Sequence, residues 1–427
     1  MLSIKLDPGQ QLDKYLASAA AALRGVLKAS EDEGVLRIAS YPSPEALPAA
    51  AIMFSLMSRR SFDVIATVSP TPPQYIVEPT VLIGFNSPIN YSNENVHDQV
   101  IVIGNNINEP PPLNATYIAG SGSVGSIVYF LLKSANETSV DPDYAVLAIS
   151  SSYASPYSDQ AGRLSGLDKL LVSALANDDK VSLFTLTSLK SYRPHILSTC
   201  SSISETIDPY FPGLTGDPDA CQRLFDSLGL SDLARKRQSV MNEDELSSTA
   251  KAVLTYVKDR VKGSYEITDF VGGLYLASDK LVINDPREAL SLLEFSGDLW
   301  GLASALSLAS NYDEEYVQAA SQLSKISRYV AEIVSTAKLV DLGLMTGFKT
   351  YSIKGLGSET PLLIVWRALK LLGYVEPQSL LAVEHEDGLL LSLMQVHEAL
   401  GRAGLQRVVS LPGSEVRGLR LWVPKEK

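Results

Sequence analysis

Apolar residues in the first half of the chain form short, nearly continuous runs separated by segments with helical spacing. The runs predict strands over residues 35–39, 62–68, 81–85, 100–104 and 144–150. Helical spacing lies between them, over residues 12–28, 49–60 and 126–133. Uninterrupted Val, Ile and Leu runs that alternate with helices are typical of a parallel sheet covered on both faces. In such a sheet, ligands bind at the carboxyl ends of the strands.

The pattern of polar and apolar residues changes twice in the second half of the chain. Residues 190 to 265 are more polar and include a predicted exposed helix over residues 242–262. From residue 266 apolar strand and helix patterns alternate again, with a long helical stretch predicted over residues 313–342. We therefore expect an α/β fold in three parts. These are an N-terminal parallel-sheet domain at 1–190, a mainly helical connector at 191–265 and a smaller α/β domain at 266–427.

Composition narrows the function classes. The 427 residues are 45% hydrophobic and 20% charged, and 36 Lys and Arg against 48 Asp and Glu give a net charge of −12. This acidic balance argues against broad nucleic-acid binding, because phosphate contacts require clustered basic side chains. Two cysteines predict no disulfide framework. No signal peptide or membrane segment is evident, so we expect a cytoplasmic protein without a membrane partner.

The loops after the predicted strands carry few groups that bind metals. They read SYPSPE from Ser40, GFNSP from Gly84, GNNINE from Gly104 and SSSY from Ser150. Hard divalent cations require carboxylate oxygens, and softer ones also bind histidine. The four loops supply Glu45, with Glu109 slightly downstream, and no histidine.

The same loops carry a resemblance to RecJ-type DHH phosphoesterases. VLRIASYPSPEALPAAAIMF, VLIGFN, VIVIGNNINE and YAVLAISSSY resemble the four motifs of that family in apolar context and in order. The family's metal ligands are replaced here at Ser40, Pro42, Pro44, Gly104, Asn105, Asn106 and Ser152. The resemblance therefore implies a DHH-type N-terminal domain that is not an enzyme and binds no metal cofactor.

The resemblance continues into the second half of the chain. INDPREALSLLEFSGDLWGLASAL, from Ile283, resembles a segment of archaeal RecJ-like nucleases. LPGSEVRGLRLWVP, from Leu411, resembles the Gly-rich motif of the DHH-associated domain, with Ser414 at the position of its histidine. Ser414, Arg417 and Arg420 are thus the candidate DNA-binding residues.

In its loss of the metal ligands, this chain resembles the archaeal replication-factor branch of the family. That resemblance implies a non-catalytic subunit of the replicative helicase assembly, which bridges GINS and MCM at the replication fork. Single-stranded DNA is a further expected partner.

Three alternatives remain open at this point. The first is a phosphoesterase with a rebuilt metal site using Glu45, Asn105 and Glu109. The second is a nucleotide-sensing protein that uses the G-x-G-x-x-G pattern at Gly120 to Gly125, although these glycines also fit a helix start built from small residues. The third is a single-stranded DNA-binding module that acts without a protein partner.

Overall fold

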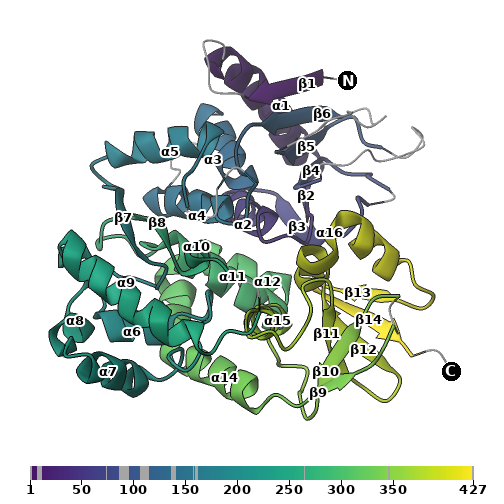
Figure 1. Ribbon diagram of the computed structural model, residues 1–427. Helices are drawn as coiled ribbons and strands as arrows, with labels where there is room; N and C mark the ends of the chain where they lie inside the picture. Colours follow the sequence, from purple (N-terminus) through teal and green to yellow (C-terminus); the bar gives the residue numbers. More distant parts are fainter. Residues whose placement is uncertain are drawn as a thin grey trace. The chain divides into compact units, whose positions relative to one another are not determined.

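A computed structural model describes residues 2–6, 12–73, 75–85, 96–105, 115–135, 141–156, 158, 162–263, 265–344 and 347–425 (Figure 1). The chain forms two compact units. Unit 1 comprises residues 1–159, 164–183 and 300–312, and unit 2 comprises residues 160–163, 184–299 and 313–427. The division of the chain into three domains at residues 190 and 265 stays a prediction.

Unit 1 is built on a six-stranded sheet in the order β1-β6-β5-β4-β2-β3. All five strand pairs are parallel. The central strands β4 and β5 are buried along their whole length, which explains their uninterrupted apolar sequences. The strands are β1 (Leu2–Leu6), β2 (Val35–Ser40), β3 (Asp63–Val68), β4 (Thr80–Ile83), β5 (Val100–Gly104) and β6 (Thr116–Gly120).

Among the described residues, six helices complete unit 1, and one of them comes from the second half of the chain. Helix α12 packs against α2, and Ser55 Oγ donates a hydrogen bond to the Ala309 carbonyl at 3.2 Å. The Tyr312 hydroxyl, just beyond α12, donates to the Asp141 carboxylate. The helices are α1 (Leu12–Glu33), α2 (Ala46–Met57), α3 (Val124–Ser134), α4 (Pro142–Ser152), α5 (Gly166–Ala176) and α12 (Leu302–Ser310).

One predicted strand of unit 1 is wrong. Residues 144–150 lie inside helix α4, whose start is set by Pro142 in the first turn and by Asp141, which accepts from the Asp143 N–H at 3.2 Å. Tyr144 to Ser152 are all buried, so the run has no polar face from which to recognise a helical period. The sheet instead contains β1 and β6, which the apolar pattern did not predict.

The first part of unit 2 is mainly helical. Its helices pack around a core that contains Phe211, Phe225 and Val253. The two cysteines lie in this core and form a disulfide, Cys200–Cys221, which joins α6 to α7. The elements are β7 (Phe184–Leu189), α6 (Thr199–Glu205), α7 (Pro218–Ser227), α8 (Ser231–Arg235), η2 (Gln238–Val240), α9 (Glu243–Lys258), α10 (Ile267–Phe270) and β8 (Val271–Leu276), with β7 and β8 antiparallel.

The second part of unit 2 holds a mixed six-stranded sheet in the order β13-β14-β12-β11-β10-β9. Only β10 and β11 pair in parallel among these strands. The predicted helix over 313–342 is wrong at its end, where β9 forms instead. The elements are α11 (Pro286–Trp300), η3 (Tyr312–Tyr316), α13 (Val317–Ser321), α14 (Leu323–Thr336), β9 (Leu339–Asp341), β10 (Thr350–Ile353), α15 (Leu362–Leu371), β11 (Leu380–Glu384), β12 (Gly388–Ser392), α16 (Leu393–Val409), β13 (Glu415–Arg417) and β14 (Arg420–Pro424).

The predicted fold class is confirmed: an α/β chain with a parallel N-terminal sheet and a second α/β region towards the C-terminus. Within the described residues, no helix combines the length and the apolar character required to cross a membrane.

The position of α12 predicts that residues 1–190 do not fold stably alone. Ala305, Leu306, Leu308 and Ala309 are buried in unit 1, so the fragment exposes the apolar face of α2 that they cover. We expect the fragment to bind a hydrophobic dye and to lack a cooperative thermal transition. Linking residues 300–312 to residues 1–183 through a Gly-Ser linker is expected to restore the transition. A cooperative transition in the fragment itself would contradict this role of α12.

Candidate functional site

Three neighbouring strands of unit 1 end at one edge of the sheet. β2 ends at Ser40, β4 at Ile83 and β5 at Gly104, and β4 pairs with both of the others. Because the strands are parallel, their carboxyl ends lie side by side, where parallel sheets bind ligands. This edge is therefore the candidate site.

The loop after β2 is filled by packed, unreactive side chains. Ser40, Pro42 and Pro44 are buried, and Ser40 Oγ donates to the Tyr41 carbonyl at 3.2 Å. The Tyr41 ring meets the Phe85 ring edge to face, with centroids 5.8 Å apart. Proline offers no side-chain ligand. The loop therefore contributes packing rather than metal-binding groups up to residue 44.

The ends of β4 and β5 are equally poor in ligands. Gly84 has φ +80°, and a Cβ there would lie 2.7 Å from the Ala46 Cβ, so this backbone has no room for a side chain. Gly104 and Asn105 are buried. Asn106 and Glu109, two further residues named from the sequence, lie outside the described residues.

Glu45 is an acidic side chain at this edge, and groups from three segments hydrogen-bond to its carboxylate. Asn105 Nδ2, after β5, donates to both carboxylate oxygens at 2.7 and 2.9 Å. The Val124 N–H of α3 donates at 3.2 Å, and the Ser155 side chain also hydrogen-bonds to it. Ser151 of α4 donates to the Glu45 carbonyl at 2.6 Å. Glu45 thus links the end of β5 to the start of α3 and to the end of α4.

These residues do not fit the two-metal centre of a DHH phosphoesterase. Such a centre needs several carboxylate and imidazole ligands around two cations. Among the residues that the structure describes, no three His, Cys, Asp or Glu side chains lie close enough together to hold one metal ion. The oxygens of Glu45 are already engaged by the donors described above.

Comparisons with known proteins identify the fold. No protein-family profile and no curated protein matches the sequence. The crystal structure of CDC45 from Entamoeba histolytica matches 99% of this chain and 96% of its own, with a TM-score of 0.58 and 11% identity. The chain has the CDC45 fold. Manganese-bound exonuclease RecJ matches 96% of the chain and 90% of its own, with a TM-score of 0.40 and 12% identity. RecJ from Thermus thermophilus in complex with Mn²⁺ matches 99% and 53%, with a TM-score of 0.40 and 11% identity.

The predicted resemblance is thereby confirmed at the level of the fold. The likeness to the CDC45 structure covers 99% of the chain and therefore spans both units. At 11% identity it carries no residue roles.

Within this CDC45 fold, the start of α3 is closed by the protein's own side chains. The first N–H groups of a helix have no partner inside the helix and form an anion-binding site when left open. Here each has a side-chain acceptor: Ser123 N–H bonds Asp168 at 2.9 Å, Val124 N–H bonds Glu45 at 3.2 Å, Gly125 N–H bonds Ser151 at 3.0 Å and Ser126 N–H bonds Ser123 at 3.3 Å.

Asp168 is a site residue that sequence reasoning missed. It lies on α5, buried, and accepts from the Ser123 and Ser126 hydroxyls at 2.6 and 2.5 Å. A signal was present in the sequence. Asp168 shares helical spacing with the buried Leu171 and Leu175, and an acid on an apolar helix face requires internal donors.

The same geometry explains the glycines at 120–125. A Cβ on Gly125 would lie 2.5 Å from the Ser151 Cβ, and one on Gly122 would lie 2.7 Å from the Leu167 Cβ. These glycines allow close packing of α3 with its neighbours, while the amides that would cradle a phosphate are engaged. The arrangement favours a helix start built from small residues over a nucleotide site.

The structure also relocates Ser152. This residue ends α4, where its hydroxyl donates to the Ile149 carbonyl at 2.6 Å. Its predicted place at the end of a strand is wrong, because residues 144–150 are helical.

The three candidate DNA-binding residues have different environments. Ser414 is half-buried, and exposed Arg417 pairs with Glu415 at 2.6 Å. Arg420 is buried, and its guanidinium donates to the carbonyls of Asp298 and, at 2.7 Å, Thr360. Contact of Arg420 with DNA would require these bonds to break. DNA binding by these residues stays a prediction.

The environment of Glu45 predicts a pH dependence. Burial raises the pKa of Glu45 from 4.5 to about 7, although hydrogen bonds from Ser155, Val124 and Asn105 lower it. In the unfolded chain this carboxyl ionises at its ordinary pKa. Its contribution to stability is therefore complete below pH 4.5 and is lost as pH rises through about 7.

We expect the Glu45→Gln variant to remove this dependence. Between about pH 5 and pH 8 the wild type should lose up to about 3 kcal/mol of unfolding free energy relative to the variant. Urea unfolding of both proteins at the two pH values measures the difference, and the subtraction cancels the other titrating groups. A difference between the proteins that does not change with pH would contradict the assignment.

Proposed function

We propose that this chain is a non-catalytic subunit of an archaeal replicative helicase assembly, in which it bridges GINS and MCM. One observation carries the proposal: a CDC45 fold along 99% of the chain whose candidate site holds buried prolines and a hydrogen-bonded glutamate where a DHH enzyme holds metal ligands. A protein that keeps the fold but has this site acts through binding rather than through metal-assisted hydrolysis.

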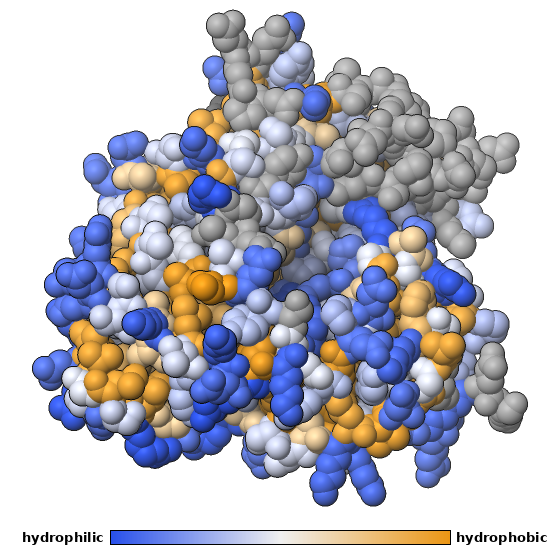
Figure 2. Space-filling view, in the orientation of Figure 1, coloured by the Kyte–Doolittle hydropathy of each residue, from blue (hydrophilic) through white to orange (hydrophobic). Residues whose placement is uncertain are grey.

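The surface is consistent with a protein partner. The net charge of −12 disfavours non-specific contact with a polyanion. On the face shown in Figure 2, hydrophobic residues form several separate groups among hydrophilic ones. Exposed apolar side chains include Leu228, Val240, Ile267 and Leu344 of unit 2. Interfaces are not distinguished by bulk hydropathy, so these groups do not by themselves define a docking surface.

Binding to purified GINS from the same source tests the proposal directly. We expect a stoichiometric complex by size-exclusion chromatography with mass detection, and recruitment of MCM when it is added. Glu45→Gln serves as a matched variant, because it alters the candidate site without changing exposed side chains, and it should bind GINS equally well. Absence of a complex at micromolar concentration would overturn the proposal.

The enzymatic alternative is tested in the same preparation. A phosphoesterase rebuilt on Glu45 and Asn105 requires Mn²⁺ to displace the Asn105 and Val124 donors from the carboxylate. We expect neither a thermal shift with Mn²⁺ nor release of nucleotides from single-stranded DNA. Manganese-dependent release that Glu45→Gln abolishes would establish the enzymatic function instead.

A further inference from the structure

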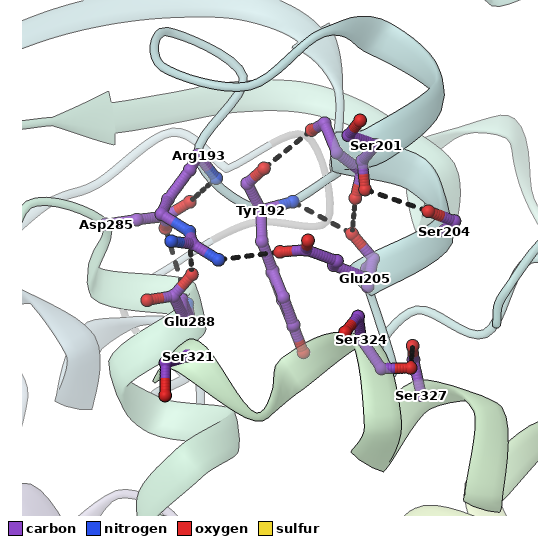
Figure 3. Close-up of polar contacts among 12 residues, drawn as sticks. Tyr192, Arg193, Ser201, Ser204, Glu205, Asp285, Glu288, Ser321, Ser324 and Ser327 are labelled. Atoms are coloured by element: carbon purple, nitrogen blue, oxygen red, sulfur yellow. Dashed lines mark hydrogen bonds and ion pairs between the residues drawn. The ribbon is translucent and has the colours of Figure 1, made fainter. Parts of the chain in front are cut away.

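A segment of unit 2 is held between two helices by a buried network. The segment is residues 191–193, which follow β7 (Figure 3). Arg193 has φ +46°, a left-handed conformation that costs a residue with a side chain about 1–2 kcal/mol. Such a conformation persists only where surrounding contacts impose it.

Helix α6 supplies the contacts on one side of the segment. Ser202 Oγ donates to the Tyr192 carbonyl at 2.6 Å, and the Tyr192 N–H donates to Thr206 Oγ1 at 2.9 Å. The Arg193 guanidinium donates to Glu205 at 2.6 Å. Two backbone groups and one charged side chain of the segment therefore depend on the position of α6.

The start of α11 supplies the contacts on the other side. The Arg193 N–H donates to Asp285 at 2.7 Å, and Arg193 Nε pairs with Glu288 at 2.6 Å. The Glu288 side chain is almost completely buried, and the Tyr316 hydroxyl donates to it at 3.0 Å. Arg193 thus bridges α6 and α11, as the dashed lines of Figure 3 show.

The disulfide fixes the helix on which this bridge rests. Cys200 lies in the first turn of α6 and Glu205 is its last residue. Cys221 lies on α7, and both cysteines are buried. The disulfide spans 21 residues and constrains α6 relative to α7 through one covalent bond. A seven-residue helix has little stability of its own, so its position depends on such anchors.

We propose that the Cys200–Cys221 disulfide is a redox-dependent clamp that keeps α6 in place and thereby holds Arg193 in its bridging conformation. Reduction by a dithiol breaks the S–S bond: the two cysteine sulfurs take up two electrons and two protons and become thiols, and the dithiol that supplies them becomes a disulfide. Without the bond, α6 moves away from α7 more often, and the contacts of Ser202, Glu205 and Thr206 with the segment open with it.

Hydrogen exchange on the full-length chain tests the clamp. Oxidised protein is compared with protein reduced by dithiothreitol, after thiol labelling under denaturing conditions has established both states. In the reduced protein we expect the opening equilibrium of residues 191–206 and 218–228 to rise roughly 100-fold, the entropic effect of releasing a loop of this length. Strands β5 and β6 of unit 1 should exchange at the same rate in both states.

A second variant separates the clamp from general destabilisation. In the oxidised chain, Glu205→Gln removes the charge that faces Arg193 and leaves the disulfide intact. Exchange of residues 191–198 should rise about tenfold, while residues 218–228 stay protected. Glu386 is exposed, and Glu386→Gln is the matched control. It should leave the exchange of both segments unchanged.

Three results would overturn the proposal. One is free thiols in the chain as purified under non-reducing conditions. Another is unchanged exchange of residues 191–198 on reduction, with or without a change in α7. The third is an equal rise in exchange throughout both units, which would make the disulfide a general stabiliser.

Discussion

Replacing Arg367 with methionine is expected to lower the free energy of unfolding by about 3–5 kcal/mol. Arg367 lies on α15 and binds both carboxylate oxygens of Glu294 on α11 at 2.8 and 2.9 Å. It also pairs with Glu398 of α16 at 2.6 Å and with Asp208 at 2.8 Å. Methionine retains much of the aliphatic stem but leaves three acids without their shared cation, and Glu294 has 0% exposure.

Arg417→Met is the matched control for this prediction. Arg417 also pairs with an acid, Glu415, but the two side chains are 53% and 60% exposed. Water and salt screen such a pair, so the variant should lose less than about 1 kcal/mol. Urea unfolding of the two variants measures both losses. Similar losses of unfolding free energy in the two variants would show that burial does not account for the contribution of the Arg367 ion pairs to stability.

Gly166→Ala is expected to lower the free energy of unfolding by about 3–5 kcal/mol, from backbone strain together with overpacking. Gly166 begins α5 with φ +57°, and a Cβ there would lie 1.6 Å from the Ser121 carbonyl oxygen. The same carbonyl accepts the Leu167 N–H at 2.8 Å. Relieving the clash therefore displaces α5, the helix whose Asp168 closes the start of α3.

The Gly34→Ala variant separates the cost of backbone strain from the cost of overpacking. Gly34 has φ +77° and no neighbouring atom within 4 Å of an added Cβ. In this variant only backbone strain opposes folding, so the free energy of unfolding should fall by about 1–2 kcal/mol. Thermal or urea unfolding compares the two. Equal losses would mean that the contact with Ser121 relaxes freely and that α5 is not held rigidly at this point.

Several features of the fold follow from local sequence. The apolar runs at β2, β4 and β5 predicted their strands and their parallel pairing, because a strand covered on both faces has no polar positions. That Ser40, Pro42 and Pro44 offer neither a carboxylate nor an imidazole is likewise a property of the sequence. A proline offers no ligand whatever the fold around it.

Other features depended on contacts between distant residues. Residues 144–150 are as apolar as a buried strand, yet they form part of α4, which starts at Pro142 and packs against α2 and α3. The assignment of α12 to unit 1 arises in the same way, since its contact with α2 joins Ser55 to Ala309. Arg420 has the sequence context of a DNA-binding residue, yet tertiary packing buries it against Asp298 and Thr360.

The sequence alone determined the class of the fold, the strands that end at the candidate site and the scarcity of carboxylates and imidazoles in the loops that follow them. Only the tertiary structure decided that Glu45 meets Asn105 and Val124, that Asp168 closes the start of α3, and that Cys200 meets Cys221. The reason is physical. Periodicity and side-chain chemistry act within a few residues of the chain, whereas burial and hydrogen-bond partners are set by segments that approach one another only after folding.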